Sequence, residues 1–339
     1  MNERTLYHCN LLIENRDTIA SLYKWESGLT HLCCSGIFTM KGIKVDVGML
    51  MQAKVLLKQQ SSIFSEFRGM ASPVVASMLS ISENPKLLLT QCRTVYDLLK
   101  KKFQSCPYLP ITAMVIAQTA APDTYEQVVS RAHGLYKMMK KAHPFLTSSD
   151  DYTFCALMAL SEKRDDTLIA DAEACFAQLK GNGMSRNGIQ SLSHVLSLYD
   201  GSPMIKCQQT LDLYQKIKEQ GIHFGTSYEL PILGILAMSG QNLTEIAANI
   251  AEIDGWLKQQ KGFGLFGSVT TKQRIMYAAL LAQPETQVSY NTDTEKQEVL
   301  SDTGAATATL ATLIAQEAAM CAAMMASASA AAATSSSSN

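Results

Sequence analysis

The apolar and polar residues of this chain alternate between two patterns, each of which predicts a different kind of helix. Residues 228–240 are apolar nearly all round and contain a single charged residue, Glu229. Residues 243–260 follow and are apolar on one side only. A helix that is apolar all round is normally buried, whereas a one-sided helix turns its polar face to water. The pattern therefore predicts packed helix pairs with an inner apolar layer and an outer amphipathic layer.

The same couplet recurs upstream at a nearly constant interval. The apolar helices are predicted at about 70–82, 108–120, 150–162, 187–199, 228–240 and 272–283. The amphipathic helices are predicted at about 85–103, 124–142, 166–180, 203–220 and 243–260. One equivalent position in the amphipathic helices is Tyr96, Tyr136, Phe176, Tyr214 and Asp254, with steps of 40, 40, 38 and 40 residues. A repeated interval of this length is typical of stacked helical pairs.

The boundaries of these segments carry residues that favour helix starts and ends. Ser202-Pro203 places a capping hydroxyl before a proline in the first turn. Gly181 and Gly221 follow two amphipathic helices, where glycine can adopt the left-handed conformation that ends a helix. No segment shows the sustained alternation that indicates a strand. The chain is therefore predicted to be all-α.

The predicted architecture is a right-handed solenoid of α-α hairpins with a period of about 40 residues. Residues 1–69 are expected to form an N-terminal helical cap of three helices, and residues 70–283 the repeat array. Residues 284–339 are expected to comprise a linker, an Ala-rich helix and a disordered Ser/Ala tail. Because the period stops near residue 283, this last part is expected to add no hairpin to the array. The pattern leaves open whether the array is open or closed.

The charge balance bears on the class of partner. The chain has 29 basic and 30 acidic residues and a net charge of −1. Proteins that bind the phosphate backbone need a concentrated basic field, so no nucleic-acid partner is expected. Lysines do gather at the ends of the amphipathic helices, but a helix C-terminus favours cations for its own electrostatic reasons.

Cysteine usage and the chain ends bear on compartment and cofactors. The nine cysteines are scattered, form no CxxC pair and mostly lie in apolar helical runs, which indicates free thiols and a reducing, cytoplasmic location. The N-terminus lacks the pattern of a secretory signal. Residues 305–333 contain one charged residue, Glu317, but alanine is only marginally hydrophobic and basic flanks are missing, so a membrane span is not expected.

The sequence GxGxxG and the histidines bear on cofactor and metal chemistry. Residues 262–267 spell GxGxxG, but a Lys/Gln-rich helix end precedes them instead of the strand that a dinucleotide site requires. The six histidines include no HExxH motif and no pair four residues apart. No cofactor and no metal are therefore expected. His31 and His194 interrupt apolar helices, where each is either a hydrogen-bonded core residue or a ligand or catalytic group.

Polar residues near the starts of the apolar helices are the candidate binding residues. Stacked apolar helices start along a common edge, so their first side chains could converge on one groove of mixed charge; capping explains most of them equally well. Arg68 and Glu229 are expected to be exposed there. The candidate binding residues are Glu26, His31, Arg68, Asp150, Asp151, His194, Glu229, Lys272 and Arg274. No catalytic residue is assigned.

Several short motifs resemble a known bacterial family. They are Lys24-Trp25-Glu26, Phe64-Ser65-Glu66-Phe67-Arg68-Gly69, Ser191-Leu192-Ser193-His194-Val195-Leu196, Tyr228-Glu229-Leu230, Lys261-Gly262-Phe263-Gly264 and Lys272-Gln273-Arg274, together with the Ala-rich end. Along essentially its whole length the chain resembles the family catalogued as domain of unknown function 4003. The resemblance implies a bacterial cytoplasmic protein, and it implies no activity, cofactor or catalytic residue.

Two functional interpretations follow. The first is a non-enzymatic scaffold that holds a protein or peptide on the surface lined by the starts of the apolar helices. The alternative is an enzyme whose site lies inside a closed α/α ring and uses residues among Glu26, His31, Asp150, Asp151 and His194 as acid and base. An enclosed pocket with several ionisable groups would favour the enzyme, and an open groove would favour the scaffold.

Overall fold

The computed structural model describes residues 1–61, 65–264 and 267–282. These residues form fourteen α-helices and three short 3₁₀ helices, and they contain no strand. The all-α prediction is therefore confirmed. The linker, Ala-rich helix and tail expected in residues 284–339 lie outside the described residues.

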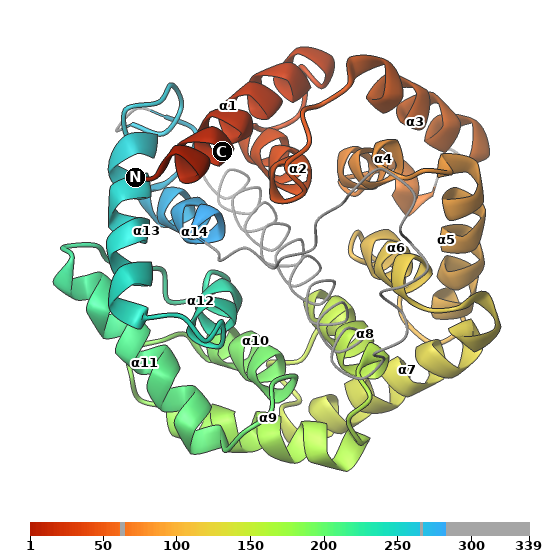
Figure 1. Cartoon of the computed structure of the whole chain (residues 1–339). Helices are drawn as coiled ribbons and strands as arrows, with labels where there is room; N and C mark the ends of the chain where they lie inside the picture. The colour runs from red at the N-terminus through yellow and green to blue at the C-terminus, as the bar shows by residue number, and fades with distance from the viewer. Residues whose placement is uncertain (62–64, 265–266, 283–339) are drawn as a thin grey trace, which may run out of the picture.

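The helices alternate along the chain between an outer and an inner layer (Figure 1). The outer helices are α1 (Glu3–Leu22), α3 (Val47–Gln60), α5 (Pro85–Lys100), α7 (Tyr125–Ala142), α9 (Asp165–Leu179), α11 (Pro203–Glu219) and α13 (Leu243–Leu257). The inner helices are α2 (Gly28–Met40), α4 (Ser72–Ser80), α6 (Leu109–Thr119), α8 (Tyr152–Leu160), α10 (Arg186–Ser197), α12 (Leu230–Ala237) and α14 (Thr271–Leu281). The 3₁₀ helices are η1 (Glu66–Arg68), η2 (Pro122–Thr124) and η3 (Ser149–Asp151).

The distribution of apolar residues explains which helix lies inside. Every residue of α12 is buried, and the helix packs against α10, α11 and α14. In α13 the buried residues recur three or four positions apart, as in Ile246, Ile250, Ile253 and Leu257, and the opposite face is polar. This is the spacing of a helix with one buried stripe. The two patterns seen in the sequence therefore correspond to the two layers.

The first and last hairpins meet, so the array closes into a ring (Figure 1). Nη1 of Arg16 in α1 donates to the carbonyl of Lys261 at 2.8 Å. The Arg16 guanidinium also lies 5.4 Å from the ring centroid of Phe263. At the start of α2, a Cβ on Gly28 would come within 2.6 Å of Oγ of Ser268. The question that the sequence left open, whether the array is open or closed, is answered by these contacts.

Residues 1–69, expected as a separate cap, belong to this ring. α1 and α2 pack together as the first hairpin, and α3 and α4 pack together as the second. α3 thus lies within residues 1–69, and α4, its partner in the hairpin, lies beyond them. None of the described helices is long and apolar enough to cross a lipid bilayer.

Two glycines end outer helices in the way that the sequence predicted. Gly181 and Gly221 have φ values of 94° and 77°, in the left-handed region that other residues rarely adopt. A Cβ at either position would meet no heavy atom within 4 Å, so the requirement for glycine comes from the backbone and not from crowding.

Replacing Gly221 by alanine should lower the free energy of unfolding by about 1 kcal/mol, since alanine resists the left-handed conformation. Chemical denaturation would measure this loss. Gly255→Ala is a matched control: Gly255 lies inside α13 without a positive φ or a close neighbour, so the change should raise stability by up to about 1 kcal/mol. Equal effects of the two substitutions would show that the cap geometry is wrong.

Candidate functional site

Seven loops lead from the outer to the inner helix of each hairpin. Because every hairpin is antiparallel and the hairpins stand side by side, these loops lie at one end of the ring. We call them the loop rim, which comprises residues 23–27, 61, 65–71, 101–108, 143–151, 180–185, 220–229, 258–264 and 267–270. The rim and the first turns that follow it contain all but one of the candidate binding residues; the exception, His194, lies further along α10.

Neighbouring loops of the rim are bonded to one another. Oγ of Ser105 donates to Oε1 of Glu66 at 3.2 Å, which joins the second and third hairpins. The backbone N–H of Ser185 donates to the carbonyl of Thr226 at 2.8 Å, which joins the fifth and sixth hairpins. Together with the approach of Gly28 to Ser268 described above, these contacts join neighbouring hairpins at three places around the rim.

Several candidate side chains cap helices of their own hairpins. Oδ2 of Asp151 accepts from the backbone N–H of Ser148 at 2.9 Å, and Oε2 of Glu229 accepts from the backbone N–H of Ser227 at 3.0 Å. Arg68 donates to the carbonyl of Ser61 at 3.1 and 2.8 Å, at the end of α3. These groups satisfy backbone atoms at helix ends.

The expected exposure of Arg68 and Glu229 is corrected by the structure. Glu229 is only 1% exposed, and Arg68 is half-buried. The physical reason is the capping just described, because a side chain that reaches back to backbone groups is drawn under the loop that it caps.

Two further candidates have their hydrogen bonds satisfied in the core. Nε2 of His31 bonds to the carbonyl of Tyr23 at 2.8 Å. Nε and Nη2 of Arg274 donate to the two carboxylate oxygens of Asp254 at 2.7 and 3.2 Å, which ties α14 to α13. The core interpretation of His31 is thus the one that the structure supports, and the position of Arg274 is that of a buried ion pair between layers.

The remaining candidates are at or near the surface of the rim. Lys272 is exposed, Glu26 is half-buried, and Asp150 accepts from Oγ of Ser148. Apart from Asp150, which precedes Asp151 in η3, these side chains make no described contact with another candidate. The single groove of mixed charge thus remains a prediction.

The structure brings Asp151 and His194 together from neighbouring inner helices. Oδ1 of Asp151 lies 3.7 Å from Nδ1 of His194, and both side chains are buried. Burial raises the pKa of the Asp151 carboxyl to about 8, and the charge of Asp150 adds to the rise. Burial lowers the pKa of the His194 imidazole to about 3, and nearby His143 lowers it further.

This distance would permit an ion pair, but desolvation opposes the charge on both partners. At pH 7 the pair is therefore a neutral carboxylic acid beside a neutral imidazole. Within the described residues Nδ1 of His194 has no hydrogen-bond partner. The Asp151 carboxyl faces this nitrogen atom. At 3.7 Å the two groups lie beyond hydrogen-bond distance, so they face each other as a buried acid and a buried base without a bond between them.

Two aromatic residues of the loop rim are not among the candidates that the sequence indicates. Trp25, between the helices of the first hairpin, and Phe145, in the fourth, are each 100% exposed. They lie in short polar loops, where no periodic signal marks them. The signal that could have found them is an isolated large aromatic between charged or polar neighbours, as in Lys24-Trp25-Glu26.

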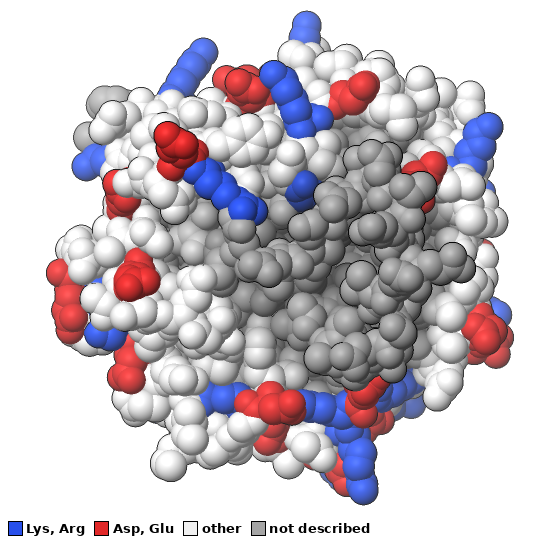
Figure 2. All heavy atoms as spheres, in the orientation of Figure 1, with Lys and Arg blue, Asp and Glu red and all other residues white. Residues whose placement is uncertain are grey.

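No group of three or more His, Cys, Asp or Glu side chains in the described part of the chain is placed to hold a metal ion. Acidic and basic side chains are interspersed over the face shown in Figure 2, without a region of one sign.

Comparison with known proteins places the chain in a family. The model of the family described as protein of unknown function (DUF4003) matches residues 15–318. The chain belongs to the DUF4003 family. This DUF4003 chain is also similar to the uncharacterized protein YeaA of Bacillus subtilis (strain 168), with 23% identity over 247 residues, which cover 70% of this chain and 72% of YeaA. The comparison with solved structures gave no match.

Replacing Asp151 by asparagine should change how stability depends on pH. The folded state keeps the Asp151 proton up to about pH 8, whereas an unfolded chain releases it near pH 4. Between pH 5 and 8 this difference lowers the free energy of unfolding of the native protein by as much as about 4 kcal/mol, and Asp151→Asn removes that loss. An asparagine oxygen can still accept from Ser148.

Melting temperatures of both proteins at pH 5 and pH 8 would measure the effect. The melting temperature of the variant, relative to the native protein, should be higher at pH 8 than at pH 5. Asp123→Asn, at an exposed position of η2, serves as the control and should give a curve parallel to that of the native protein. A parallel curve for Asp151→Asn as well would contradict the neutral buried acid.

Proposed function

We propose that this protein is a non-enzymatic scaffold that binds a protein or peptide partner on the loop rim. The observation that carries the proposal is the full exposure of Trp25 and Phe145 on the loop rim. Isolated exposed aliphatic residues are ordinary, but a whole tryptophan and a whole phenylalanine in water leave a large apolar area unburied.

Large exposed aromatic side chains are frequent binding hot spots of protein interfaces. Tryptophan is enriched among the few residues that dominate binding energy, and each large aromatic buries about 150–250 Å² when it is covered. Trp25 has charged neighbours, Lys24 and Glu26, in its own loop. An apolar anchor with a polar surround is the common composition of an interface.

The geometry of the ring suits the presentation of such anchors. Trp25 belongs to the α1–α2 hairpin and Phe145 to the α7–α8 hairpin, and these hairpins lie apart on the ring (Figure 1). Of the loops that separate them, that of the second hairpin is bonded to that of the third through Glu66 and Ser105. A partner that engages both must therefore extend across the ring. The near balance of 29 basic and 30 acidic residues favours a protein over a nucleic acid as that partner.

We also propose that the hairpins are copies of one structural repeat of about 40 residues. Five successive outer helices begin at Pro85, Tyr125, Asp165, Pro203 and Leu243, and these starts support the period inferred from the sequence. Repeat proteins place equivalent loops side by side and commonly bind partners through them.

A second candidate function is an enzyme with its site inside the closed α/α ring. Two observations favour it: the ring is closed, and Asp151 and His194 form a buried acid–base pair. Their side chains are only 5% and 4% exposed, however, so a substrate would have to displace part of the protein to reach them. Burial of the pair therefore makes the scaffold the better-supported function.

Site-specific photo-cross-linking in the native cells tests the proposed function. A photoreactive phenylalanine analogue placed at position 25 or 145 should yield the same cross-linked partner protein. The analogue at position 204, an exposed residue of outer helix α11, is the control and should not yield it. Cross-links that are absent at both rim positions, or identical at all three positions, would refute a partner site on the rim.

Once the partner is identified, Trp25→Ala should weaken its binding at least tenfold, or about 1.4 kcal/mol. Because Trp25 is fully exposed, the same change should alter the free energy of unfolding by no more than about 0.5 kcal/mol. Titration calorimetry and chemical denaturation measure these two quantities. Unchanged affinity in both Trp25→Ala and Phe145→Ala would contradict the assignment of the anchors.

A further inference from the structure

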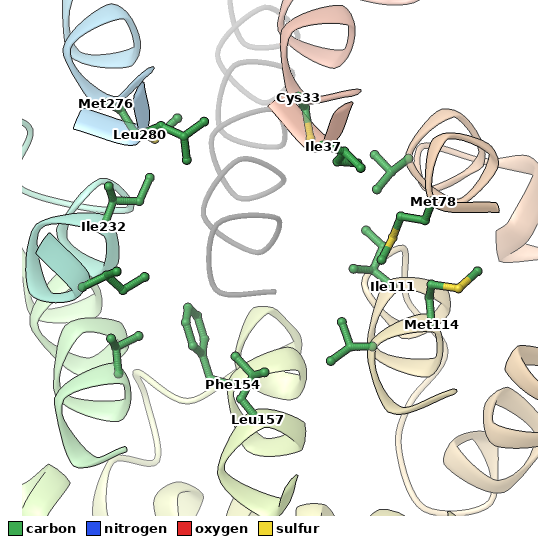
Figure 3. Packing of buried hydrophobic residues seen from close by; sticks show 14 of the residues in the cluster. Cys33, Ile37, Met78, Ile111, Met114, Phe154, Leu157, Ile232, Met276 and Leu280 are labelled. Carbon is green, nitrogen blue, oxygen red and sulfur yellow. The ribbon is translucent and has the colours of Figure 1, made fainter. Parts of the chain in front are cut away.

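The inner helices surround a central space with apolar side chains. Figure 3 shows apolar side chains of the inner helices pointing toward the centre of the ring. We call them the lumen wall; one from each of α2, α4, α6, α8, α12 and α14 is Ile37, Met78, Ile111, Phe154, Ile232 and Leu280. None of them carries a charge or a hydrogen-bonding side chain.

The apolar lumen wall determines what kind of molecule or segment can fill the central space. Water gains few hydrogen bonds from such a wall, and contact between water and apolar surface is unfavourable. The occupant must therefore be apolar over most of its surface. Thioether side chains such as that of Met78 can adapt their shape to it.

The chain itself contains a segment with this chemistry. Residues 305–333 consist mainly of alanine and other small residues and contain a single charged residue, Glu317. Alanine has the highest helix propensity and the smallest side chain that still presents an apolar surface, so a helix of this composition is narrow. A stretch of 20 such residues in a helix is about 30 Å long.

Two features connect this segment with the ring. First, the chain leaves the described region from α14, which is an inner helix and contributes Leu280 to the lumen wall. Second, the family model continues to residue 318, well beyond the end of α14 at Leu281, so the family shares part of the Ala-rich segment as well as the ring.

We propose that the Ala-rich segment, residues 305–333, occupies the lumen of its own ring as a helix packed against the lumen wall. The end of the hairpin period near residue 283 agrees with this, because a single central helix adds no hairpin. The tether favours the same chain over a second copy, since a linked segment has an effective concentration in the millimolar range. The proposal is independent of partner binding on the loop rim.

Cys321 lies within the Ala-rich segment and reports on its surroundings in the full-length protein. In the lumen its thiol should react with N-ethylmaleimide at least tenfold more slowly than a thiol introduced by Ser337→Cys in the Ser-rich end. Peptide mass spectrometry over a time course gives both rates. Equal rates would overturn the proposal.

A charge in the lumen wall should release the segment. In Phe154→Glu the alkylation rate of Cys321 should rise at least tenfold, whereas Met204→Glu, on the exposed side of α11, should leave the rate unchanged. The buried thiols of Cys175 and Cys207 show whether the variant is still folded, because they should stay unreactive. A Cys321 rate that stays slow in a folded Phe154→Glu protein would contradict the proposal.

If Phe154→Glu unfolds the ring, Ala319→Glu tests the proposal without changing the wall, and it should raise the Cys321 rate in the same way. A slow Cys321 in folded Ala319→Glu would overturn the proposal.

Dilution distinguishes a segment that is bound by its own chain from a segment that is supplied by a second copy. Protection of Cys321 that persists over about a hundredfold dilution supports binding within one chain, and protection lost on dilution would assign the lumen to a second copy instead.

Discussion

The contact between the first and last hairpins is the constraint on which the rest of the structure depends. Arg16 and Lys261 are 245 positions apart, yet one donates a hydrogen bond to the other, and Phe263 packs under the same guanidinium. In an open array, the surface of each end hairpin that would otherwise pack against a neighbouring hairpin is exposed to water. Helical repeats normally need capping units for this reason. Closure removes both ends at once. It also encloses the central space within the lumen wall.

Much of this fold could be predicted from the sequence because its determinants are local. The two helix patterns, the Ser202-Pro203 start and the glycine ends at Gly181 and Gly221 each depend on a few neighbouring residues. Closure could not be predicted, because it depends on the small rotation between successive hairpins summed over seven of them. The placement of residues 1–69 in the ring could not be predicted for the same reason, since their helices show the two-layer pattern less clearly.

The candidate site was less accessible to sequence reasoning. A carboxylate at a helix start has the same position and chemistry whether it accepts from the backbone of the preceding loop, as Asp151 and Glu229 do, or binds a ligand. The approach of His194 to Asp151 depends on packing between α8 and α10, which periodicity does not specify. Trp25 and Phe145 lie outside any helical pattern, so their exposure becomes visible only when the loops are placed on the ring.

A designed disulfide across the closing contact tests the ring most directly. A Cβ at position 28 would lie 3.3 Å from Cβ of Ser268, close to the separation that a disulfide requires. The protein carrying Gly28→Cys and Ser268→Cys should form this bond within one chain on mild oxidation, as shown by peptide mass spectrometry. The pair Gly28→Cys and Ser227→Cys, which joins the first hairpin to the sixth, should not. A closed ring predicts nearly complete linkage between positions 28 and 268, and thiols that stay free there would contradict it.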